Sequence, residues 1–130
     1  MNTMFYYTLD SAKTIEEALE SVEARLKDNG FGVLWHLDIP KTLQNKGVDF
    51  KQPYHVLEVC NPVEAKLVLE QNALVGYFLP CKVVVYEDQG QTKIGLTKPT
   101  ALIELVQDKE LETTAQKIEE TLIKALKEAA

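Results

Sequence analysis

The side chains of this sequence best suited to chemistry are its two cysteines, Cys60 and Cys81. Cys60 stands directly before Asn61 and Pro62, which are favoured at the N-cap and at the first position of a helix. The partial positive charge of a helix N-terminus stabilises a thiolate. Cys81 follows Pro80 at the start of a predicted strand. We therefore expect either a redox or sulfur-handling pair of thiols at one edge of a sheet, or two small buried core residues.

Three further side chains could take part in chemistry near these thiols. Glu58 alternates onto the same face of a predicted strand as Cys60, where it could be a general base or simply a solvated or interface carboxylate. His36 is expected at the surface or an interface, and His55 partly buried. Zinc ligands usually come in close pairs, whereas these histidines and cysteines are scattered, so we expect no metal site and no cofactor. The candidate ligand or thiol site comprises Cys60, Cys81, Asn61, Glu58 and His36.

Sequence patterns of known catalytic mechanisms are missing from the chain. It has no Ser-His-Asp pattern, and its six glycines do not have the spacing of a phosphate-binding loop or a dinucleotide fingerprint. Whether the protein is an enzyme therefore stays open at this stage.

Length and composition limit the other possibilities. The 130 residues suit a single domain, residues 1–130, and the 45% apolar content is enough for a core without disulfide or metal staples. The net charge of −6, from 14 basic and 20 acidic residues, argues against nucleic-acid binding. The first ten residues do not resemble a signal peptide, and the longest uncharged run is too short to cross a membrane. We expect a cytoplasmic location with reduced cysteines.

The pattern of apolar residues predicts alternating strands and helices. Thr14 and Glu17 have the spacing of a capping box, with Ser11 as a competing cap, and Asn29-Gly30 is expected to end the helix that follows. Strands are expected over residues 4–9, 31–38, 54–60, 81–87 and 91–98, and further helices over residues 62–71 and 108–129, with residues 100–106 left ambiguous. The order β-α-β-β-α-β-β-α predicts an α+β two-layer sandwich, an antiparallel sheet with helices on one face.

In such a sandwich the second face of the sheet is left for a ligand or another subunit. Alternation assigns Phe31, Val33, Trp35, Leu57 and Val59 to the helix-covered face. It assigns Leu34, His36, Val56, Glu58 and Cys60 to the open face. This mixed open face is expected to form a homodimer, a ligand groove, or both.

Two segments that contain the cysteines, Cys60-Asn61-Pro62 and Leu79-Pro80-Cys81, resemble the domain-of-unknown-function 302 (DUF302) family. Further matching residues are Leu37-Asp38-Ile39, Lys46-Gly47-Val48, Pro53-Tyr54, Leu57, Val59, Ala65, Gly76 and Pro99. The resemblance implies a two-layer α+β fold, similar in topology to the TATA-box-binding protein, and a dimeric structure, but no established activity. An acidic residue often precedes the proline that matches Pro99, and Lys98 stands there instead.

These observations predict a small cytoplasmic homodimer that binds a small-molecule ligand or acts as an accessory protein. The alternative is a thiol-based redox or sulfur-handling protein that uses Cys60 and Cys81. Neither a nucleic-acid partner nor a membrane is expected.

Overall fold

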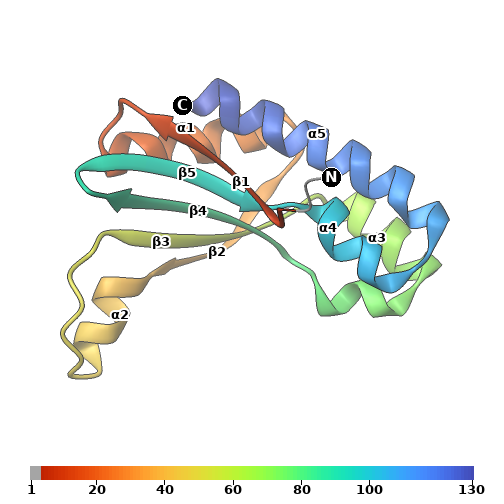
Figure 1. Cartoon of the computed structure of the whole chain (residues 1–130), viewed down its shortest axis with the longest axis horizontal. Helices are drawn as coiled ribbons and strands as arrows, with labels where there is room; N and C mark the ends of the chain where they lie inside the picture. Colours follow the sequence, from red (N-terminus) through yellow and green to blue (C-terminus); the bar gives the residue numbers. More distant parts are fainter. Residues whose placement is uncertain (1–3) are drawn as a thin grey trace.

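The computed structural model describes residues 4–130, which form one antiparallel sheet with its main helices on one face (Figure 1). The strands are β1 (Tyr6–Ser11), β2 (Gly32–Asp38), β3 (Tyr54–Cys60), β4 (Cys81–Asp88) and β5 (Gln91–Thr97), in the sheet order β1-β5-β4-β3-β2. Helices α1 (Ile15–Asp28) and α5 (Lys109–Ala129) lie along the sheet. The predicted α+β two-layer sandwich is confirmed.

Local capping interactions explain where the helices begin and end. Thr14 and Glu17 form the predicted capping box at the start of α1, and Gly30 adopts a φ of +88° after its end, a backbone conformation that glycine tolerates best. The side chain of Asn61 accepts hydrogen bonds from the backbone N–H groups of Val63 and Glu64, which fixes the start of α3 (Pro62–Gln71). These three predicted helix ends are confirmed.

The first strand differs from the sequence prediction, and the segment left ambiguous by the sequence is helical. The strand was expected to break at Asp10-Ser11, but β1 continues through Ser11, which pairs with Thr92 of β5. Residues 100–106 fold into helix α4 (Pro99–Ile103) followed by a short 3-10 turn, η2 (Glu104–Val106). The segment after β2 forms a further short helix, α2 (Ile39–Asn45), which packs beside β2 and β3 and lies at the lower left of Figure 1.

The main core lies between the sheet and the helices α1 and α5. Val22 and Leu26 of α1 and Leu122 of α5 are completely buried against completely buried strand residues. Those strand residues are Val59, Val83, Val85 and Ile94.

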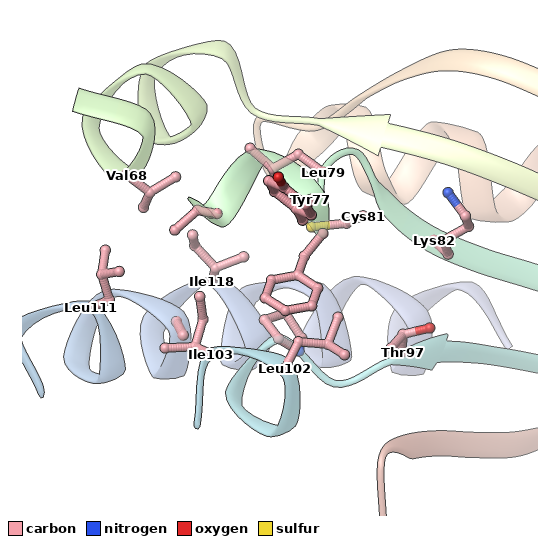
Figure 2. A pocket seen from close by; sticks show the side chains of 14 residues that line it. Val68, Tyr77, Leu79, Cys81, Lys82, Thr97, Leu102, Ile103, Leu111 and Ile118 are labelled. Carbon is pink, nitrogen blue, oxygen red and sulfur yellow. The ribbon is translucent and has the colours of Figure 1, made fainter. Parts of the chain in front are cut away.

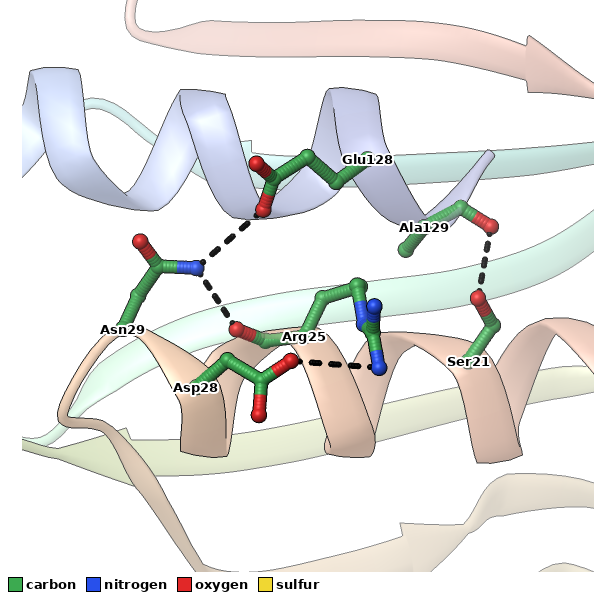
Figure 3. A network of polar contacts seen from close by, with 6 residues as sticks. All are labelled: Ser21, Arg25, Asp28, Asn29, Glu128 and Ala129. Atoms are coloured by element: carbon green, nitrogen blue, oxygen red, sulfur yellow. Dashed lines mark hydrogen bonds and ion pairs between the residues drawn. The ribbon is translucent and has the colours of Figure 1, made fainter.

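Polar contacts also join α1 to the C-terminal end of α5 (Figure 3). The Ser21 hydroxyl donates to the Ala129 carbonyl at 2.9 Å, and the Asn29 amide donates to the Glu128 carboxylate at 3.3 Å.

A β-bulge in β2 changes which side chains reach each face of the sheet. Val33 pairs with Val59, but the register shifts before Trp35, which pairs with Glu58. Trp35 was predicted on the covered face, yet it is 55% exposed on the open face. His36 was predicted on the open face, yet it lies opposite Leu57 on the covered side. One extra residue inverts the alternation after it, which is why both assignments are wrong.

Apart from Leu34, which lies in the bulge and has no partner in the register, the other assignments to faces agree with the register. Phe31 and Leu57 are buried, and Val33 lies opposite the completely buried Val59.

A second apolar cluster lies beyond the end of the sheet, where α5 faces α3, α4 and the 3-10 turn η1 (Ala73–Tyr77). Its buried members are Val68, Val75, Ile103, Leu111 and Ala115.

We predict that Leu122→Ala lowers the free energy of unfolding by about 2–5 kcal/mol, because it removes completely buried atoms and leaves a cavity. Leu105→Ala is the matched control, because Leu105 is 73% exposed and its truncation should change stability by only about 0.5 kcal/mol. Urea denaturation followed by circular dichroism measures both values. Equal losses in the two variants would contradict this description of the core.

Candidate functional site

A cavity of about 250 Å³ lies between the end of the sheet and the second apolar cluster (Figure 2). Its walls come from five different parts of the chain: α3, the segment from η1 to Cys81, the end of β5, α4 and the first half of α5. Apolar lining side chains include Val68, Leu79, Leu102, Ile103, Leu111 and Ile118. Such concave, mostly apolar sites between elements are where small ligands usually bind.

The sequence forms this cavity because α5 continues past the sheet. Leu122 and Leu126 of α5 pack on the strands, whereas Leu111 and Ala115 of the same apolar stripe belong to the second cluster. Ile118 lies between these two groups and lines the cavity. The chain enters β4 through Leu79–Pro80, whose peptide bond is cis.

Cys81 is the only cysteine among the residues that line the cavity. It pairs with Val59 across β3 and β4, so its side chain points to the covered side of the sheet. The pKa of the Cys81 thiol is raised to about 11, mainly because the thiol is buried and to a smaller extent because Cys60 is near, whereas Lys82 opposes both effects. At neutral pH this group is therefore an uncharged thiol, not a thiolate.

The charged group of Lys82 and the hydroxyl of Thr97, two residues at the rim of the cavity, are directed away from it. Figure 2 shows the Lys82 ammonium and the Thr97 hydroxyl pointing away from the apolar lining. The Lys82 ammonium is held by the Glu58 carboxylate on β3, with an N–O distance of 2.5 Å. The lining of the cavity is consequently mainly apolar, with the neutral Cys81 thiol in its wall.

In the structure, the residues of the site predicted from the sequence do not lie together. Cys60 and Cys81 lie at the same end of two interior strands, not at an edge of the sheet, and alternation directs their side chains to opposite faces. Glu58 is engaged by Lys82, and the side chain of Asn61 is used as a helix cap. His36 lies near the other end of β2, beside His55.

Several cavity residues were not among the sequence candidates. Leu102 and Ile103 fall in the segment left ambiguous by the sequence, whereas Tyr77 is the last residue of the 3-10 turn η1 and Phe78 follows it. The apolar stripe of α5 is the one sequence signal that could have pointed to this place, since it is longer than the sheet requires.

The fold and the cavity together define a small α+β protein in which a mainly apolar cavity lies beside a five-stranded antiparallel sheet. The chain belongs to the family described as "Domain of unknown function DUF302", whose family model matches residues 7–129. The resemblance carried by the two cysteine segments is thereby confirmed.

The chain is also similar to a solved structure, described as the crystal structure of an uncharacterized conserved protein DUF302 from Bacillus stearothermophilus. The two are 49% identical, the match covers 98% of this chain and 99% of that chain, and the TM-score is 0.94. No curated protein matches the chain. Within residues 4–130 there is no helix long and apolar enough to cross a membrane.

We predict that Cys81 in the folded protein reacts far more slowly than an ordinary cysteine with iodoacetamide. With its pKa raised from 9.0 to about 11, the thiolate fraction at pH 8 falls roughly hundredfold. Mass spectrometry of the Cys60→Ser variant, sampled over time at pH 8 with and without urea, isolates this rate. Equal rates in the folded and unfolded chain would contradict the burial of this thiol.

Proposed function

We propose that this protein is a ligand-binding or accessory protein whose cavity holds a small, uncharged, mainly apolar molecule. The observation that supports this most is the apolar lining between α3, α4 and α5, with the Lys82 charge directed outward and paired to Glu58. Burying an unpaired charge is costly, so a charged ligand is disfavoured here. The volume of about 250 Å³ is below the range of about 300–1,000 Å³ typical of drug-sized ligands, which favours a smaller molecule.

Toluene and benzoate test this proposal because they share one ring and differ in charge. We expect toluene to shift the NMR amide signals of Cys81, Ala115 and Ile118, which line the cavity, and benzoate to leave them unchanged. Equal shifts with both probes, or toluene shifts confined to other regions, would refute the proposal.

A variant that fills the cavity gives an independent readout. Ala115 is 3% exposed and lines the cavity, so we expect Ala115→Leu to weaken toluene binding at least tenfold. Ala101→Leu is the matched control, since Ala101 lies on α4 outside this lining. Thermal melting of both variants confirms that they are folded, and unchanged toluene affinity in Ala115→Leu would contradict the assignment of the site.

We further propose that the protein is a homodimer formed through the outer surface of α3 and η1. Four large apolar side chains of this surface are exposed: Val63, Leu67, Leu74 and Tyr77. Exposed apolar patches of this kind mark interaction surfaces.

Lys66 and Glu70, one turn apart on α3, form a long ion pair of 4.0 Å beside this patch. In a two-fold symmetric, antiparallel α3–α3 contact, the lysine of each copy would face the glutamate of the other.

We predict that Leu67→Lys converts the dimer into a monomer of 14.7 kDa in size-exclusion chromatography with light scattering. Leu67 is 54% exposed in the patch, and Val48, 51% exposed in the loop before β3, provides the control variant Val48→Lys. The control should leave the mass unchanged. A monomeric wild-type protein, or a dimer that survives Leu67→Lys, would refute this interface.

The alternative function is thiol-based redox or sulfur-handling chemistry with Cys60 and Cys81. Support comes from their proximity on neighbouring strands, close enough for Cys60 to affect the pKa of Cys81. The raised pKa of Cys81 favours the ligand-binding proposal instead. Both proposals keep the cytoplasmic location expected from the sequence, with which the two free thiols are compatible.

A further inference from the structure

The chain has two histidines, and the fold brings both of them together far from the cavity. His36 lies on β2 and His55 on β3, and the distance between His36 Nε2 and His55 Nδ1 is 2.8 Å. The ring centroids are 4.9 Å apart, with an angle of 58° between the ring planes. One ring nitrogen donates a hydrogen bond to the other, so the two rings share a single proton at this contact.

The pairing depends on the bulge in β2. Without the register shift between Val33 and Trp35, strand alternation would direct His36 to the face opposite His55. The same shift leaves the Trp35 side chain 55% exposed, so the bulge does not serve to bury apolar surface. Bulges often re-aim a side chain at a functional site, and here the re-aimed side chain is His36.

The two imidazole nitrogens lie at a spacing that suits coordination of one metal ion. A neutral imidazole is the form that binds metal ions. Two nitrogens bound at about 2.0–2.1 Å and at right angles around a metal lie about 2.9 Å apart, close to the observed 2.8 Å.

The carboxylates around the pair favour a cation. Asp38 lies opposite His55 in the register and also caps α2 by accepting from the Lys41 N–H at 3.1 Å. Glu16 is exposed in the first turn of α1. No group of three or more His, Cys, Asp or Glu side chains in the described part of the chain is placed to hold a metal ion. A metal here would therefore have two protein ligands and several open positions.

We propose that His36 and His55 form a two-imidazole site for a divalent transition-metal ion of the Cu²⁺ or Ni²⁺ class, with water in the other positions. Nitrogen ligands at right angles suit the tetragonal geometry of these ions. Binding breaks the imidazole–imidazole hydrogen bond. The donor ring gives the proton of its coordinating nitrogen to solvent and takes one up on its other ring nitrogen, so both ligands are neutral imidazoles and no net proton is released. The site is independent of the cavity and of the proposed ligand.

Copper binding tests the proposal with a direct spectroscopic signature. We titrate the full chain with Cu²⁺ at pH 7.5 and record pulsed electron paramagnetic resonance, which detects the remote nitrogens of coordinated imidazoles. The expected result is one Cu²⁺ per chain with two coordinated imidazoles. Because the sequence holds only His36 and His55, a two-imidazole signal in a single chain must come from them. A spectrum with one or no coordinated imidazole overturns the proposal.

Variants separate this site from the thiols. His36→Gln and His55→Gln should each weaken Ni²⁺ binding at least tenfold in calorimetry, whereas the double variant Cys60→Ser/Cys81→Ser should bind as the wild type does. Thermal melting without metal reports whether each variant is folded. Wild-type affinity in either histidine variant, or loss of binding only in the cysteine variant, overturns the proposal.

Discussion

The burial of one long apolar stripe on α5 is the interaction on which the rest of this structure depends. With 21 residues, α5 is about 32 Å long, and only its second half packs on the sheet. Its first half carries Leu111 and Ala115 beyond the strands, where α3, η1 and α4 must cover them. These short elements do not completely fill the space beyond the end of the sheet. The unfilled part is the cavity, which lies between the main core and the second apolar cluster.

This arrangement explains the positions of the two segments that contain the cysteines. Asn61-Pro62 starts α3, which forms one wall of the second cluster, and Pro80-Cys81 returns the chain to the sheet at the cavity. Both segments thus mark the points where the chain leaves and re-enters the sheet. The thiol of Cys81 sits at the junction between the two cores, where burial keeps it protonated.

The sequence predicted local structure better than it predicted the site. Capping residues such as Thr14 and Asn61 act within one helical turn, so their spacing alone indicated the helix ends. The bulge in β2 leaves no mark in the alternation of apolar residues, and Trp35 and His36 were therefore assigned to the wrong faces. The cavity joins Val68, Leu102 and Ile118, residues far apart in the chain, which no spacing rule could bring together.

We propose that the space beside Cys81 is dry and takes small apolar molecules. Dry apolar cavities bind xenon, whereas polar ones hold ordered water. X-ray diffraction from crystals pressurised with xenon tests this directly. The account predicts anomalous density for xenon among Leu79, Cys81 and Ile118. A chain of ordered water in that space, with no xenon bound, would contradict it.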